Sequence, residues 1–149
     1  MEGFIPHIIG NTETTAFEYV PAKAQAYVVG QALLWDATNG RLDYASGAVT
    51  PQYFAYTDTT VAANGDLLCV TRVRDDIIYE THASASLASV ANGSKVTLAA
   101  ASSGNYPAGV RVTATTTNGT ATILGTAAEP LANIADKAAG CKVFVKFEI

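Results

Sequence analysis

Four Asn-Gly pairs punctuate the chain and constrain its fold more than any other sequence feature. They stand at residues 39–40, 64–65, 92–93 and 118–119. Asn and Gly tolerate a positive φ, which a type I′ hairpin turn requires at both of its central positions. The sequences that flank the four pairs do not match one another, so the pairs predict recurring hairpins rather than a true repeat.

Short β-rich runs lie between these turns. In 109–117 and 141–149, β-branched or aromatic residues alternate with polar ones, and this period of two places one face of a strand in a core and the other in solvent. The runs expected to form strands are 26–30, 32–37, 41–45, 52–57, 66–73, 77–82, 94–100, 109–117, 120–125 and 141–149.

Helical signals are weak. The best candidate segment, 127–140, is interrupted by Pro130 and allows at most a single turn or a short helix before Gly140. We therefore expect an all-β fold, a small antiparallel β-barrel or sandwich of about 7 to 10 strands with less than about 15% helix.

The alternation also predicts the interior of the protein. A slip of one residue in any strand would exchange its two faces. Trp35 is expected to close one end of the core, the alternative being an exposed anchor for a partner. The side chains expected inside are those of Leu34, Val70, Ile78, Val96, Val112, Ile123, Val143 and Val145.

The first 25 residues differ from the rest. They contain Pro6, Pro21 and a polar stretch at 11–15, and their alternation is weak. We interpret residues 1–25 as an extended N-terminal arm packed on a neighbouring subunit, and 26–149 as the β-domain, which should fold without the arm. A flexible tail is the alternative, but such tails lack this density of apolar side chains. The expected anchors are Phe4, Ile5, Ile8, Ile9, Phe17 and Tyr19.

Composition excludes several classes of protein. Charged residues make up 15% of the chain and the net charge is −4, so clustered cations for binding nucleic acid are lacking. The 49% of hydrophobic residues excludes disorder of the whole chain. No run approaches the roughly 20 apolar residues of a membrane span, and no secretory signal is visible. We expect a chain made and folded in a cytoplasm, whose weakly charged surface contacts other proteins.

The sequence offers weak signals for metal binding. Glu80 and His82 could share one face of a strand, but a surface-facing pair is the simpler interpretation. Asp36 and Asp43 flank the first turn and would need further oxygen ligands to hold calcium. The two cysteines, Cys69 and Cys141, lie in alternating stretches and are expected to be buried free thiols, with a bridge between neighbouring strands left open.

Signals for catalysis are weaker still. Asp75 and Asp76 are adjacent and point to opposite faces of an extended chain, so a turn explains them better than an acid–base pair. Neither a phosphate-binding glycine loop nor a nucleophile elbow is found. We therefore expect no catalytic, cofactor-binding or metal-binding residues. The aromatic cluster comprises Tyr44, Tyr53, Phe54 and Tyr56. Such residues could form a stacking platform for single strands or sugars, but Arg and Lys are absent between Arg41 and Arg72. Half-buried strand aromatics explain the cluster better, and a protein interface is the functional alternative.

Two parts of the chain carry a pattern of turns and apolar positions, namely 26–81 and the last stretch, ADKAAGCKVFVKFEI at 135–149. The pattern comprises Gly30 followed by Leu33-Leu34-Trp35, the hairpin to Arg41-Leu42, Thr50-Pro51, and the step from Val61 to Asp66 into a strand that ends near Val73. It resembles the head-decoration, or capsid-stabilising cement, proteins of tailed bacteriophages. The similarity covers about half of the chain and leaves 84–126 without a match.

The resemblance implies a structural role without chemistry. Proteins of this family are made in the host cytoplasm and bind the outer surface of the capsid in the virion, where they clamp neighbouring capsid subunits. The implied partners are the major capsid protein and further copies of this chain, a trimer being favoured over a dimer; no nucleic acid, membrane or cofactor is implied. The N-terminal arm would lie on the capsid or exchange between subunits.

Other classes of protein remain as alternatives. One is a different virion β-module, associated with a tail or fibre, although long repeats and a coiled-coil stretch are lacking. Another is a bacterial carbohydrate- or ligand-binding β-module, which would favour a face rich in tryptophan, whereas Trp35 is the single tryptophan here. A small enzyme is the third.

Overall fold

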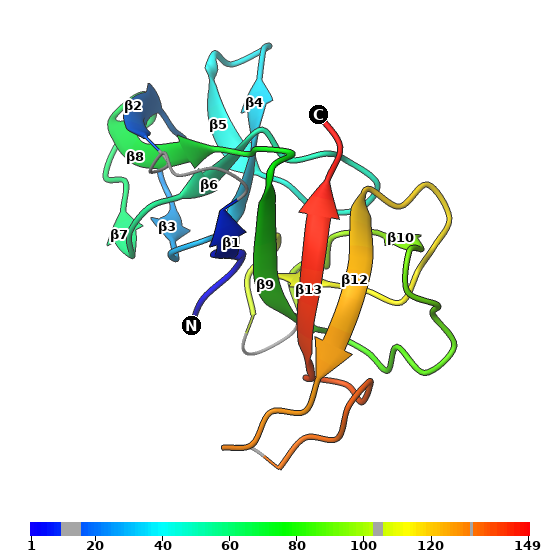
Figure 1. Ribbon diagram of the computed structural model, residues 1–149. Helices are drawn as coiled ribbons and strands as arrows, with labels where there is room; N and C mark the ends of the chain where they lie inside the picture. The colour runs from blue at the N-terminus through cyan, green and yellow to red at the C-terminus, as the bar shows by residue number, and fades with distance from the viewer. Residues whose placement is uncertain (10–15, 103–105, 132) are drawn as a thin grey trace.

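The computed structural model describes residues 1–9, 16–102, 106–131 and 133–149. In these ranges thirteen short strands form three sheets and no helix occurs (Figure 1). The prediction of an all-β fold is thus confirmed, although the strands are more numerous than expected. Before Gly140 the chain forms turns, and Glu129 and Ile134 exchange two backbone hydrogen bonds of 3.0 and 3.3 Å.

The larger sheet, sheet A, contains six strands. Their order is β1-β9-β13-β12-β10, all antiparallel, and β11 adds to β9 in the parallel sense. The strands are β1 (Ile5–Ile9), β9 (Ile77–Ala83), β10 (Lys95–Val96), β11 (Arg111–Val112), β12 (Ala121–Ala127) and β13 (Lys142–Phe147). The C-terminal strand β13 therefore lies in the middle of the sheet (Figure 1).

The second sheet, sheet B, has the order β2-β8-β6-β4-β5, and β3 pairs with β7 in a small third sheet. The strands are β2 (Phe17–Pro21), β3 (Ala26–Tyr27), β4 (Ala32–Asp36), β5 (Arg41–Tyr44), β6 (Tyr53–Ala55), β7 (Thr59–Thr60) and β8 (Leu67–Arg72). Sheet B curls until Ala22 forms an isolated parallel bridge with Leu42 of the opposite edge. The sheet is not closed into a barrel, so of the two predicted architectures the sandwich is the one that fits.

The apolar residues form two cores. At the centre of the first, between sheets A and B, the rings of Phe4, Phe54, Tyr79 and Phe147 pack with centroids 4.8 to 6.0 Å apart. The second core fills the curl of sheet B and contains Ala22, Tyr27, Leu33, Leu42, Ala55, Val61, Leu68 and Val70. Strands β4 and β6 contribute to both cores, because alternate residues on a strand point to opposite faces.

Most of the predicted interior is confirmed. Val70, Val96, Val112, Ile123, Val143 and Val145 are buried. Ile78 is only half-buried, because β9 directs Ile77 and Tyr79 into the core instead. The adjacent apolar pair Ile77-Ile78 satisfies the alternation in either register, so the sequence could not choose between the two faces. Leu34 is half-buried against the first core, while its neighbour Leu33 enters the second.

The Asn-Gly pairs are turns, but not of the predicted type. Only one residue of each pair has a positive φ: Gly40, Gly65, Gly93 and, in the last pair, Asn118. A type I′ turn needs both. Only the first pair links two mutually paired strands, β4 and β5, and there the Gly40 N–H donates to the Asp36 carbonyl at 2.7 Å. The Asp36 carboxylate also accepts hydrogen bonds from the N–H groups of Thr38 and Asn39, which favours this longer turn.

The described strands near the start of the chain pair with strands of the same chain, β1 with β9 and β2 with β8. Phe4 is 1% exposed and lies in the first core, so the expectation that it contacts a partner is wrong. Backbone hydrogen bonds join Gly3 to Val29 and Phe4 to Gly30. A Cβ atom at Gly3 would lie 2.2 Å from the Gly30 carbonyl oxygen, so this close approach requires glycine.

The other expected anchors lie on two edge strands. Ile5 is half-buried, and β1 pairs along its length with β9, placing Ile8 opposite Ile78 and Ile9 opposite Ile77. β2 pairs with β8, and its residues Phe17 and Tyr19 are exposed. The side chains of Ile8 and Ile9 and all of residues 10–15, which include the expected polar crossing at 11–15, lie outside the described residues.

Candidate interaction surfaces

An exposed group of apolar side chains covers the β2 end of sheet B. We define the aromatic patch as Phe17, Tyr19, Tyr56 and Leu67, which are 54%, 62%, 48% and 61% exposed. Tyr19 lies opposite Cys69 on β8, and Pro21 lies opposite Leu67, so β2 and β8 direct these side chains to one face of the sheet. Contiguous exposed apolar side chains of this kind make the patch a candidate interaction surface.

The rings of the aromatic patch hold one another in place. Phe17 stacks on Tyr56 with centroids 5.4 Å apart and an interplanar angle of 27°. Tyr19 meets Phe17 edge-on at 6.2 Å. Such pairs contribute about 0.5–1.5 kcal/mol beyond the burial of their area. The patch is therefore a preorganised surface. Binding of a partner costs less side-chain entropy here than it would if the rings were mobile and had to be ordered.

The patch is the uncovered continuation of a core-forming face. Phe54 of β6 lies opposite Thr71 of β8, which in turn lies opposite Phe17 of β2, so all three share one face of sheet B. At the central strand β6 this face is covered by sheet A, and Phe54 is buried in the first core. At the β2 end it is exposed. The same strand pattern therefore produces a core residue on the central strand β6 and a surface residue on the edge strand β2.

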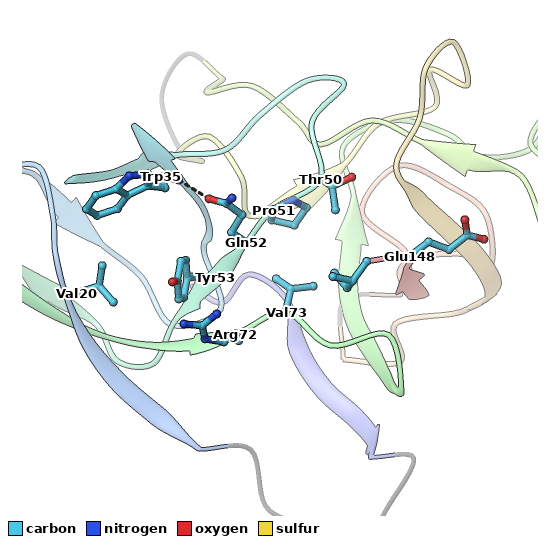
Figure 2. Close-up of a pocket in the computed structure, with 10 residues that line it drawn as sticks. Val20, Trp35, Thr50, Pro51, Gln52, Tyr53, Arg72, Val73 and Glu148 are labelled. Atoms are coloured by element: carbon cyan, nitrogen blue, oxygen red, sulfur yellow. Dashed lines mark hydrogen bonds between the residues drawn. The ribbon is translucent and has the colours of Figure 1, made fainter. Parts of the chain in front are cut away.

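A groove lies on the opposite face of sheet B (Figure 2). Trp35 of β4, Tyr53 of β6 and Arg72 of β8 line one side of it, and the register places Tyr53 opposite Arg72. Pro51, Val73 and Glu148 lie on the other side, and Ile149 also lines the groove. The groove has a volume of about 940 Å³, which is within the range of small-ligand sites.

The charged side chains of the groove are paired. The Arg72 guanidinium lies 3.3 Å from Glu18 and 5.4 Å from the centroid of the Tyr53 ring. Glu148, at the far end, forms a 2.9 Å ion pair with Lys95, and the hydrogen bond from Lys95 lowers the pKa of Glu148. Each of the two charged side chains that line the groove, Arg72 and Glu148, is therefore paired with an opposite charge beside it.

Trp35 lies at the edge of this groove and is 39% exposed. The expectation that it closes the core is wrong, and the exposed alternative fits the structure. The reason is the alternation along β4, which directs Leu33 and Trp35 to the same face. Leu33 and Leu42, the residue opposite Trp35 on β5, fill the second core, whereas Trp35 lines the groove beside it. The Trp35 backbone N–H donates a 2.8 Å hydrogen bond to the Gln52 side-chain oxygen.

The side chains considered as metal ligands contact other partners instead of one another. Glu80 and His82 do share a face of β9, but Glu80 contacts His7 and His82 contacts Glu129, each at 3.1 Å. Asp43 accepts hydrogen bonds from Lys23 and Gln25, and Asp36 organises the first turn. Across 1–9, 16–102, 106–131 and 133–149, no three His, Cys, Asp or Glu side chains converge as a metal site would require.

The remaining candidates are structural. Asp75 and Asp76 form the turn before β9, where Arg74 binds the Asp76 carboxylate and lowers its pKa. Cys69 and Cys141 are free thiols, and Cys141 is fully buried. Of the predicted aromatic cluster, Phe54 is buried, Tyr44 and Tyr53 pack on the second core, and Tyr56 belongs to the aromatic patch.

Sequence reasoning found Phe17 and Tyr19 but missed Leu67 and the groove. The run Leu67-Leu68 at the start of β8 gave no indication of which leucine faces outward. The groove unites residues from four strands and the C-terminus, and no spacing in the sequence links them. Within the described ranges, no helix is long and apolar enough to cross a membrane. No protein-family model matches the chain, and no curated protein matches it.

Proposed function

We propose that the chain is a structural virion protein that binds the outer surface of a tailed-phage capsid and stabilises it by clamping neighbouring capsid subunits. The observation that carries the proposal is the aromatic patch, a preorganised apolar surface on an edge of the domain. The resemblance of 26–81 and 135–149 to decoration proteins supports the same role. The proposed role involves no catalysis.

The proposed contact uses Phe17 and Tyr19 as anchors in an apolar depression of the major capsid protein. Large aromatic side chains at the centre of an interface contribute most of its binding energy. Phe4 has no part in it, since it is buried in the chain's own core. We further propose that the protein acts as a homo-oligomer, with a trimer favoured, because several modest contacts to one shell then combine by avidity.

The test is a binding titration onto heads assembled without this protein. Phe17→Ser combined with Tyr19→Ser should weaken binding by at least about tenfold, since each lost anchor costs about 1 kcal/mol or more. Leu131→Ser is a matched control, because Leu131 is 99% exposed and lies on the loop after β12, outside the patch. It should bind like the unaltered chain.

Two results would refute the proposal. One is equal binding of the double variant and the control. The other is recovery of the native protein with phage tails, or with no particle, instead of with intact heads at near-stoichiometric copy number. Circular dichroism and a melting curve of each variant show whether a loss of binding reflects loss of the patch alone.

A further inference from the structure

The groove on the other face of sheet B has the composition of a ligand site. It combines an exposed indole, a phenol ring and polar side chains that converge from separate elements (Figure 2). We propose that this groove binds a neutral oligosaccharide, which is a second binding activity that goes beyond attachment to a capsid. The inference depends on the groove alone, so it is independent of the aromatic patch.

Trp35 supplies the stacking surface. One face of a pyranose ring presents C–H groups, which pack on the flat, electron-rich face of an indole. Trp35 is positioned for such contact by β4, and its backbone is held by the hydrogen bond to Gln52. Tyr53 lies beside it on the neighbouring strand β6 and extends the apolar floor. A sugar ring on Trp35 would therefore have its edge over Tyr53 and Gln52.

The polar side chains match the hydroxyl groups of a sugar. Gln52 uses its side-chain oxygen for the Trp35 backbone N–H, which leaves the NH₂ group of the amide as a donor at the groove. Arg72 offers further donors, while Thr50 can donate and accept. Glu148 at the far end is an acceptor. Sugar hydroxyls both donate and accept, so they suit this mixed lining.

Charge and size narrow the choice of ligand. Arg72 is paired with Glu18, and Glu148 with Lys95, so neither charged side chain that lines the groove offers an uncompensated charge to a phosphate or sulfate. A neutral ligand can instead hydrogen-bond to these groups while the pairs persist. The groove volume of about 940 Å³ exceeds that of a single monosaccharide, which favours an oligosaccharide lying from Trp35 towards Glu148.

The experiment uses Trp35 itself as the probe, since it is the single tryptophan of the chain. The full-length protein is titrated with cellohexaose, chitohexaose and maltohexaose while indole fluorescence is followed. We expect saturable quenching or a blue shift with at least one of them, largely insensitive to salt. Dextran sulfate serves as the anionic comparison. A response to dextran sulfate alone, abolished by salt, would overturn the assignment of a neutral ligand.

Two variants and a control test whether the saccharide binds in the groove. Calorimetry with the saccharide that responds should show binding at least about tenfold weaker for Trp35→Ala and for Gln52→Ala, because each removes a direct contact. Tyr56→Ala is the matched control, since it removes an exposed aromatic ring from the opposite face. It should leave saccharide binding unchanged.

The outcomes also separate the groove from the patch. Trp35→Ala should retain binding to capsids, and the Phe17→Ser, Tyr19→Ser variant should retain binding to the saccharide. Failure of all three hexasaccharides to bind, or equal binding by the folded Trp35→Ala protein, overturns the proposal. Saturation of the groove by a capsid-derived peptide in place of sugar would likewise overturn it.

Discussion

Phe4 and Phe17 lie near the same end of the chain, each beside or within an edge strand, yet they have opposite environments. Phe4, just before β1, is 1% exposed and packs on Phe54 and Phe147. Phe17, the first residue of β2, is more than half exposed, and its ring packs on Tyr19 and Tyr56 of the aromatic patch. The difference lies in what covers each sheet face, since sheet A and sheet B close over Phe4 and leave Phe17 open.

This difference shows that an apolar residue near a terminus does not by itself indicate a partner. Phe4 stabilises the fold of its own chain, while Phe17 and Tyr19 are available for binding. Mutation of Phe4 should lower the stability of the fold, whereas mutation of Phe17 or Tyr19 should weaken association with a partner. We make four predictions on stability and exposure, from the largest expected effect to the smallest.

Deletion of residues 1–9 should have the largest effect. It removes Phe4 from the first core and exposes the edge of β9 that pairs with β1. The expected loss is a large part of the roughly 5–15 kcal/mol that stabilises a domain, so the truncated chain should unfold or aggregate. Sequence interpretation predicts instead a folded core. Cooperative thermal unfolding of the truncated chain near the native melting temperature would contradict a stabilising role for β1 and Phe4.

Phe4→Ala should destabilise the protein by about 3–5 kcal/mol, the usual cost of emptying a phenylalanine site in a core. Phe17→Ala is the matched comparison, the same substitution on the exposed side, and should change stability by no more than about 0.5 kcal/mol. Urea unfolding monitored by circular dichroism measures both. Equal destabilisation by the two substitutions would remove the distinction between the two phenylalanines.

Acid should loosen the segment that follows β2. Burial by itself would raise the pKa of Asp43, but hydrogen bonds from Gln25 and Lys23 outweigh it and lower the pKa below its usual value. Deprotonated Asp43 therefore stabilises the fold above its unfolded pKa of about 3.9, and this contribution is lost as the pH falls through the lower folded value. The effect is small because the Lys23–Asp43 pair is partly exposed.

The measurement is urea unfolding at pH 7 and at successive steps below pH 4. Asp43→Asn should be less stable than the native chain at pH 7, and the gap should narrow as the pH falls. A gap that stays constant over this range would show that ionisation of Asp43 does not stabilise the fold.

Thiol labelling should distinguish the exposed aromatic patch from the buried core without altering stability. Cys69 is half-buried beside the aromatic patch, opposite Tyr19, whereas burial raises the pKa of the Cys141 thiol and shields it. Iodoacetamide should therefore modify Cys69 well before Cys141, as read by peptide mass spectrometry. Binding to capsids should then protect Cys69. Equal labelling rates for the two cysteines would show that Cys69 is as shielded as Cys141.

Local sequence was enough to determine the fold class and the position of most strands. Alternation in 109–117 and 141–149 placed Val112, Val143 and Val145 inside, because a period of two is a property of each strand alone. It could not choose between Ile77 and Ile78, where both registers satisfy the pattern. The Asn-Gly pairs marked turns for the same local reason, although not their type.

Only the tertiary structure decided which apolar surfaces remain exposed. Whether Phe4, Phe17 or Trp35 is buried depends on a sheet contributed by distant residues, such as β13 at the C-terminus, which meets β9 in the middle of sheet A. The groove beside Trp35 likewise requires four strands and Ile149 to come together. A side chain is buried only where another part of the chain packs against it, and a local sequence pattern does not identify that part.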